Sequence, residues 1–187
     1  MDTNITNNLE QAKQRMNGAI KHLEEELAKI RAGRATPDIL KDIKVEYYGQ
    51  SMPINQVANV VAADARTLII QPWDKNMLDP IEKEILKANL GFTPINNGKV
   101  IRINIPELTQ ERREQLAKLV KKEGEDAKIA VRNIRRDIIS SIKKLKDNGI
   151  SEDEVKKGVE KAEEITKDFI EKIDKIIENK TKDVMSV

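Results

Sequence analysis

Residues 109–147 read TQERREQLAKLVKKEGEDAKIAVRNIRRDIISSIKKLKD, a stretch whose apolar side chains recur every three or four positions. Residues at this spacing share one face of an α-helix, so the stretch predicts a single long amphipathic helix. An isolated helix cannot bury such an apolar face, and it therefore needs partner helices. The apolar positions are Leu116, Leu119, Val120, Ala127, Ala130, Val131, Ile134, Ile138, Ile142 and Leu145.

The chain is predicted to turn back directly after this stretch. Residues 148–151 (NGIS) break the apolar pattern, Gly149 suits the position after a helix end, and Ser151 with Glu154 forms a capping box. So short a loop makes the following helix antiparallel to the first. Its apolar face carries Val155, Val159, Ala162, Thr166, Phe169, Ile173 and Ile176.

The first thirty residues supply the third helix. Their apolar side chains step alternately by four and three residues, which is a heptad pattern. They are Ile5, Leu9, Ala12, Met16, Ile20, Leu23, Leu27 and Ile30. Together, residues 1–30 and 107–187 predict an elongated, antiparallel three-helix bundle.

Residues 31–106, between these helices, have a different pattern. The segments 43–48, 57–62, 66–71 and 99–105 are rich in Val, Ile and Tyr and predict strands. One helix interrupts them, with Asp79 as its expected N-cap, Pro80 in its first turn and Gly91 at its end. The fold class is therefore α+β: a helical bundle with a small inserted β/α domain.

An inserted domain is joined to its host by two connectors, here segments 31–36 and 104–107. Two short connectors restrict the small domain to rotation about a hinge. The candidate hinge residues are Arg31, Gly33, Arg34, Thr36 and Pro106, because glycine absorbs backbone changes and proline stiffens the chain. An ordinary domain junction accounts for the spacing equally well.

Composition excludes several function classes. The chain of 187 residues has no Cys and a single His, His22, which leaves no disulfide, no thiolate metal site and no His-assisted nucleophile. Neither a glycine-rich nucleotide loop nor an apolar run long enough to span a membrane is present. The start lacks a signal-peptide profile. We expect a cytoplasmic, monomeric protein that is not an enzyme and holds no metal or cofactor.

The formal net charge of +2 conceals two opposed segments. Residues 109–147 carry 12 basic and 7 acidic side chains, whereas residues 150–187 carry 8 basic and 11 acidic ones. Projected on the helix, eight cations of the basic segment fall within an arc of about 100° that faces away from the apolar positions. We call this set the basic stripe: Lys118, Lys121, Lys128, Arg132, Arg135, Arg136, Lys143 and Lys146.

The basic stripe predicts a phosphate-binding face, since Lys and Arg neutralise phosphates and Arg can bind them in two-point geometry. Aromatic residues make up only 3% of the chain, which favours folded RNA over stacked single strands. The alternative is a solvated helix face partly neutralised by the acidic helix. Separately, the helical projection predicts a partly buried Arg15–Glu123 pair that sets the helix register.

Five motifs resemble those of the ribosome recycling factor family: residues 30–37 (IRAGRATP), 45–49 (VEYYG), 64–68 (DARTL), 108–113 (LTQERR) and 131–137 (VRNIRRD). They occur in the family's order and spacing, and the resemblance covers essentially the whole chain. It implies an L-shaped molecule with dimensions like those of transfer RNA, in which a three-helix bundle carries a small β/α domain.

The resemblance also implies a function. Such a protein binds the post-termination ribosome along large-subunit ribosomal RNA and, with elongation factor G and GTP hydrolysis, splits it into subunits, which releases messenger and transfer RNA. The family's RNA-contacting arginines correspond to Arg132, Arg135, Arg112 and Arg113. The stripe adds Arg136, Lys128 and Lys121 to the expected RNA-binding set. The inserted domain is expected to swing about the hinge and meet elongation factor G.

Two other function classes remain open from the residues themselves. A structural or adaptor bundle would bind another protein's helix and leave the basic stripe in solvent. An enzyme with carboxylate chemistry in the inserted domain is a weaker alternative, because the carboxylates are interleaved with Lys, as on ordinary solvated helix surfaces.

Overall fold

The computed structural model describes residues 1–186. The chain divides into two compact units, one formed by Met1–Ala32 and Gln110–Val187 and the other by Gly33–Thr109. Compared with these bounds, the predicted inserted domain of residues 31–106 begins two residues early and ends three residues early. The first unit is a helical bundle and the second a small β/α domain, so the predicted α+β class is confirmed.

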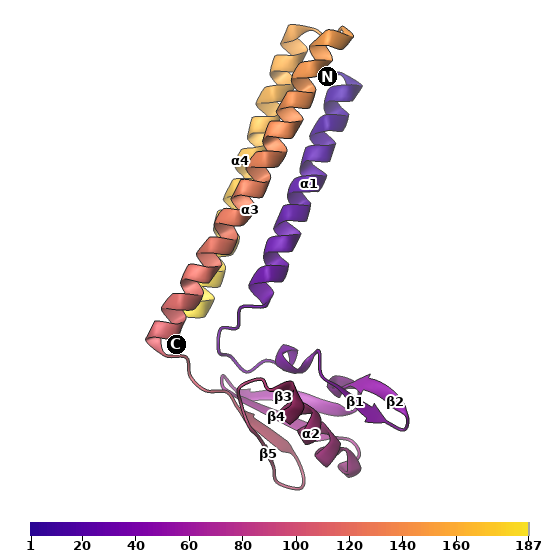
Figure 1. Cartoon of the computed structure of the whole chain (residues 1–187), viewed down its shortest axis with the longest axis vertical. Coiled ribbons are helices and arrows are strands. Elements are labelled where there is room, and N and C mark those ends of the chain that lie inside the picture. The colour runs from indigo at the N-terminus through magenta and orange to yellow at the C-terminus, as the bar shows by residue number, and fades with distance from the viewer. Residues whose placement is uncertain (187) are drawn as a thin grey trace. The chain divides into compact units, whose positions relative to one another are not determined.

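The bundle consists of three helices: α1 (Thr3–Ala28), α3 (Gln110–Lys144) and α4 (Glu152–Met185). Figure 1 shows them side by side, with α3 and α4 joined by a tight turn. At about 1.5 Å per residue, the 35-residue α3 is roughly 50 Å long. The core follows the predicted apolar faces and includes Ile5, Leu9, Ala12, Met16, Leu23, Leu27, Val120, Val131, Ile138, Ile142, Val155, Ala162, Phe169 and Ile173.

Short polar contacts fix the helix ends where the sequence predicts caps. The Ser151 side chain accepts a hydrogen bond from the Glu154 N–H at 3.2 Å, and Gly149 ends the preceding turn with φ +89°. The predicted return contact of the capping box is not formed. Instead, the Glu154 carboxylate accepts from the Asp2 N–H at 3.2 Å, which ties the start of α4 to the start of α1.

The predicted Arg15–Glu123 pair is wrong. Arg15 pairs with Asp137 at 3.0 Å, and both side chains are about half exposed. Lys29 lies fourteen residues after Arg15 on α1, and Glu123 lies fourteen residues before Asp137 on α3. The pKa of Lys29 is raised chiefly by a hydrogen bond to Glu26 and also by the charge of Glu123. The register differs because α3 begins well beyond the end of α1.

This offset also explains a second error in the predicted core. α1 ends at Ala28, and the register above brings this end to the level of Gly124. The part of α3 before Gly124 therefore packs against α4 without α1. Leu119, predicted to be buried, points to the side that α1 would occupy and is 41% exposed.

Two glycines allow close approach of the helices. A Cβ atom on Gly124 would lie 2.5 Å from Ile177 Cγ1 of α4. A Cβ atom on Gly158 would lie 2.8 Å from Ile5 Cγ2 and 3.1 Å from Ile142 Cγ2. Gly158 thus lies where side chains of α1 and α3 meet α4, and no larger residue fits there without displacement of the two isoleucines.

Gly158→Val should lower the free energy of unfolding of the bundle by about 1–3 kcal/mol, because overpacking forces neighbours out of their preferred rotamers. Urea unfolding followed by helical circular dichroism measures the change. Gly18→Ala is the matched control: nothing lies within 4 Å of a Cβ at this exposed position of α1. There, alanine should stabilise by about 0.5–1 kcal/mol through helix propensity. An unchanged midpoint for Gly158→Val would contradict the packing argument.

The small unit contains two antiparallel sheets and one helix. β1 (Lys44–Tyr47) pairs with β2 (Gln50–Pro53), and a second sheet has the order β3-β4-β6-β5. Its strands are β3 (Ala58–Asp64), β4 (Thr67–Pro72), β5 (Pro94–Asn96) and β6 (Ile101–Asn104). The helix α2 (Leu78–Ala88) contributes Ile81 and Ile85 to a core that contains Leu68 and Ile70 of β4.

The four predicted strands are found, with shifted ends, but β2 and β5 were not predicted. The predicted ends of α2 are wrong. A 3-10 turn (Lys75–Met77), capped by the Asp74 side chain, leads into α2, so Asp79 lies inside the first turn. Its carboxylate accepts a hydrogen bond from the Asn96 side chain at 3.0 Å. Asn89, with φ +48°, ends the helix two residues before Gly91.

Candidate nucleic-acid interface

The basic stripe on α3 divides into two sets in the structure. Three of its eight cations contact acidic side chains of α4: Lys128, Arg135 and Lys146. The other five make no hydrogen bond or ion pair with any residue among 1–186. We call these five the open row: Lys118, Lys121, Arg132, Arg136 and Lys143.

Arg135 has the most constrained contact. Its Nε donates to Glu163 Oε2 at 2.7 Å, and its Nη2 donates to Glu163 Oε1, so one edge of the guanidinium meets one carboxylate. This contact lowers the pKa of Glu163. The pair's stabilising contribution is therefore fully present above the carboxyl's unfolded-state pKa and is lost as the pH falls through the lowered value. Both charges persist at neutral pH.

The other two paired cations lie on either side of Arg135 along the stripe. Lys128 contacts Asp174 and, at 3.6 Å, Glu125; its side chain is only 18% exposed, and its pKa is raised mainly by the hydrogen bond to Asp174. Lys146, in the turn after α3, lies 2.9 Å from Glu152. Each of the two cations thus has an acidic partner within the bundle.

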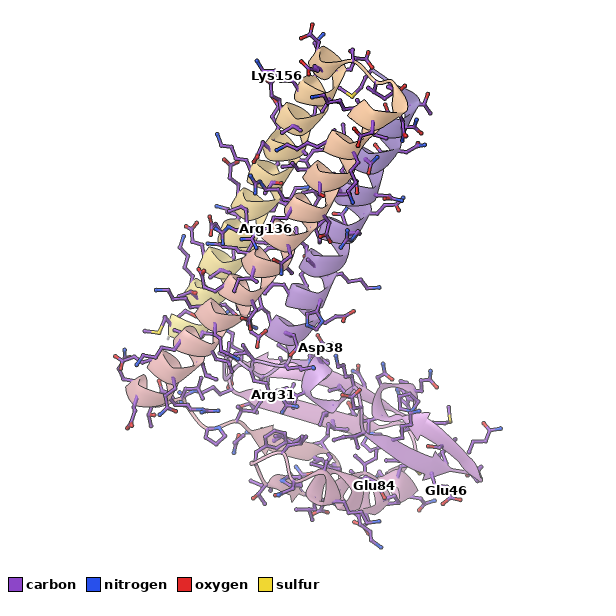
Figure 2. All side chains as sticks on the ribbon, turned by 45° about the horizontal axis from the view of Figure 1, so that its top comes forward. Arg31, Asp38, Glu46, Glu84, Arg136 and Lys156 are labelled. Atoms are coloured by element: carbon purple, nitrogen blue, oxygen red, sulfur yellow. The ribbon has the colours of Figure 1, made fainter. Side chains whose placement is uncertain are left out.

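The open row lies on the part of α3 that no other helix covers. All five side chains are exposed, and Figure 2 marks Arg136 near the middle of the bundle. Around the helix, α4 lies on the side of Gly124 and Lys128, and α1 lies on the side of Asp137. Lys118 and Lys121 border a groove beside α4, whereas the other three cations of the open row face neither helix. The result is a mainly positive face on a stiff helix, interrupted by the exposed Glu125 and suited to a row of phosphates.

The two arginines at the start of α3 lie elsewhere. Arg112 is exposed and donates to Gln115 Oε1 at 3.2 Å, but by helix geometry it points about 120° away from Arg136. Arg113 is only 9% exposed. Arg112 and Arg113 therefore do not extend the open row.

Sequence reasoning missed the acidic residues that divide the stripe. Glu152, Glu163 and Asp174 are spaced by eleven residues, or three helical turns, and so form one row along α4. We call them the acid row. This spacing is visible in the sequence. What it could not reveal is that the row faces Lys146, Arg135 and Lys128 in register.

The candidate hinge residues differ in how firmly the small unit holds them. Gly33 has φ +75°, and a Cβ there would lie 2.9 Å from Leu108 Cγ. The Ala35 N–H donates to the Ala65 carbonyl at 2.8 Å, and the neighbouring Thr36 begins a 3-10 turn. On the return connector, the Ile105 N–H donates to the Arg66 carbonyl at 2.7 Å, immediately before Pro106. Arg31 and Arg34 are exposed.

A second surface lies on the open face of the four-stranded sheet. Val61 pairs with Ile69, Ile69 with Arg102, and Arg102 with Ile95, so their side chains form one row across the four strands. Val61 and Ile95 are 45% and 53% exposed. The adjacent residues of β4 and β6 point into the buried core on the opposite face.

The described part of the chain contains neither a candidate metal site nor a candidate membrane-spanning helix. No group of three or more His, Asp or Glu side chains within residues 1–186 could hold a metal ion. None of the described helices is long and apolar enough to cross a membrane. His22 is exposed on α1.

Comparison with known proteins identifies the family. The family model described as "Ribosome recycling factor" matches residues 23–185. The ribosome-recycling factor of Bacillus licheniformis is 50% identical over 188 residues, covering all of both chains. That of Geobacillus kaustophilus is 51% identical over 180 residues, covering 96% of this chain and 97% of the relative.

Solved structures agree with these matches. A solution structure of the ribosome recycling factor is 37% identical, covers all of both chains and superposes with a TM-score of 0.78. A second structure describes the T. thermophilus ribosome recycling factor and E. coli elongation factor G bound to the E. coli post-termination complex. Its matching chain is 40% identical, with a TM-score of 0.63, over 98% of this chain and 100% of that one. Sequence and fold agree over the full length, and the chain belongs to the ribosome recycling factor family.

Proposed function

We propose that this chain recycles ribosomes in the cytoplasm: it binds the post-termination ribosome through large-subunit ribosomal RNA and, with elongation factor G and GTP, separates the subunits. The observation that carries the proposal is the open row on α3, in a chain that belongs to this family. The T. thermophilus relative bound with elongation factor G to a post-termination complex supports the same partners here.

In this proposal, the bundle anchors the protein on RNA. Arg132, Arg136 and Lys121 bind phosphates directly, together with the other cations of the open row. Arg135 and Lys128 lie beside them but are shared with Glu163 and Asp174. Arg112 lies on another side of the helix, and the limited exposure of Arg113 leaves it outside the proposed face.

The small unit is proposed to move and to meet elongation factor G. Hydrogen bonds hold Ala35 and Ile105 to the small unit, so the proposed pivots are residues 31–34 and 106–109. The exposed apolar row of Val61 and Ile95 supplies a face suited to a protein partner, since apolar side chains on a surface favour protein contacts. The free energy for splitting comes from the partner's GTP, so this chain needs no catalytic residue.

Binding to purified large ribosomal subunits should fall steeply with salt. For about five phosphate contacts, the logarithm of the association constant should decrease linearly with the logarithm of salt concentration, with a slope of about −4. Co-sedimentation across a salt series measures this slope. Salt-independent binding, or no binding, would instead favour the adaptor bundle that recognises another protein's helix.

A further inference from the structure

The acid row of α4 lies alongside the basic stripe and contacts it at three levels. Glu152, Glu163 and Asp174 meet Lys146, Arg135 and Lys128, respectively. These contacts connect separate segments of the bundle and are not the i, i+4 pairs common on single helices. Because the three acids recur after three full turns, they pair with one edge of the stripe from Lys128 to Lys146 and leave the other edge, the open row, without acidic partners on α4.

Glu163 occupies one of the two guanidinium edges of Arg135 through which a phosphate could bind. A carboxylate and a phosphate both bind a guanidinium through two parallel N–H bonds. Glu163 already takes up Nε and Nη2 of Arg135. The Arg135 side chain is nevertheless 33% exposed, so part of it remains accessible to solvent.

The ion pair between Arg135 and Glu163 is weak enough for a phosphate to replace the carboxylate. Glu163 is 47% exposed, and exposed ion pairs contribute little to stability, typically below about 1 kcal/mol. A phosphate that approaches Arg135 therefore does not have to disrupt the fold, but it must displace the carboxylate or tolerate its negative charge. Both requirements weaken binding.

We propose that the acid row, and Glu163 above all, is a built-in competitor for RNA phosphates that limits the affinity of α3 for RNA. This inference rests on the proposed function and adds regulation of the same face. The open row makes the uncompensated contacts, whereas Arg135, Lys128 and Lys146 bind phosphate only at the expense of their intramolecular partners. A factor that must leave its RNA after each round benefits from such weakened binding.

Glu163→Gln tests the proposal. The amide keeps the shape of the side chain but removes the charge that competes for Arg135. Affinity for purified large ribosomal subunits should rise about threefold to tenfold at about 0.1 M salt, and the salt slope should become steeper by about one. Unchanged or weaker binding by Glu163→Gln, with an unchanged thermal melt, would overturn the proposal.

Asp168→Asn is the matched control. Asp168 lies on the same helix, is exposed, and makes no ion pair within residues 1–186. Its neutralisation also removes one negative charge, so it reports the general electrostatic effect alone. Glu163→Gln must exceed this control; equal gains from both variants would mean that net charge, and not competition at Arg135, is responsible.

A double-mutant cycle with Arg135→Gln isolates the pair. If Glu163 acts through Arg135, then Glu163→Gln should bring no gain beyond the Asp168→Asn control when Arg135 is already Gln. A full gain in that background would also overturn the proposal. The proposed function fails separately: if Arg132→Glu with Arg136→Glu leaves binding intact, the phosphate-binding face itself is wrong.

Discussion

Replacement of both Arg132 and Arg136 by glutamate should reduce the affinity for large ribosomal subunits by about a hundredfold or more at about 0.1 M salt. Both guanidinium groups are exposed and unpaired within residues 1–186, so the substitution removes two phosphate contacts and places two negative charges among the remaining cations. The salt slope should become shallower by about two, one for each lost contact. Co-sedimentation with purified large subunits measures both quantities.

Lys21→Glu with Lys157→Glu provides the charge-matched control. Lys21 on α1 and Lys157 on α4 are exposed, lie outside the basic stripe and make no ion pair in the described chain. The same change in net charge there should reduce affinity only slightly. Equal losses from the two double variants would mean that the whole molecule's charge drives binding and that the open row is not a specific face. Because the residues substituted in either double variant make no ion pair within the described chain, both variants should melt at the same temperature as the parent chain.

The sequence was sufficient for features that depend on local spacing. The buried faces of the bundle follow from apolar residues three and four positions apart, and the turn between α3 and α4 follows from Gly149 and Ser151. The periodicity of a helix is fixed by its own geometry, so it can be read without knowledge of its neighbours. The strands β1, β3, β4 and β6 were recognisable for the same reason, from residues suited to extended backbone.

Features that depend on long-range registry were not predictable. Arg15 pairs with Asp137, because α3 starts well beyond the end of α1, and no local pattern encodes that offset. Strands β2 and β5 are short, and each includes a proline, which is unfavourable in most strands. Both are stabilised by neighbours: β2 by β1, and β5 by β6.

In the candidate site, too, local spacing was predictable and the packing of one helix on another was not. The arc of eight cations on α3 was predictable from the sequence, because it depends on one helix alone. Which cations remain uncompensated depends on α4, since Glu163 and Asp174 neutralise Arg135 and Lys128 only through the packing of two helices. The helical projection therefore overestimated the number of cations free to bind phosphate.

Gly33→Pro should impair subunit splitting by about tenfold, with a smaller effect on binding to isolated large subunits. Gly33 has φ +75°, whereas proline fixes φ near −65°, so the connector must adopt another conformation. Gly33 also lies against Leu108, which belongs to the second connector; a Cβ at position 33 would be 2.9 Å from Leu108 Cγ. The substitution thus disturbs both proposed pivots and leaves the open row on α3 unchanged. Splitting of post-termination complexes with elongation factor G and GTP is the measurement.

Gly91→Pro separates the hinge from general backbone strain. Gly91 has φ +87°, so proline is as incompatible there as at position 33, but nothing lies within 4 Å of a Cβ and the residue is far from both connectors in the sequence. If residues 31–34 and 106–109 act as pivots, Gly91→Pro should leave splitting close to that of the parent chain. Equal loss of binding and splitting in Gly33→Pro would argue against a hinge, because a rigid connector that merely joins two units would affect both steps alike. Selective loss of splitting, absent from the Gly91 variant, requires that the small unit move after the bundle has bound.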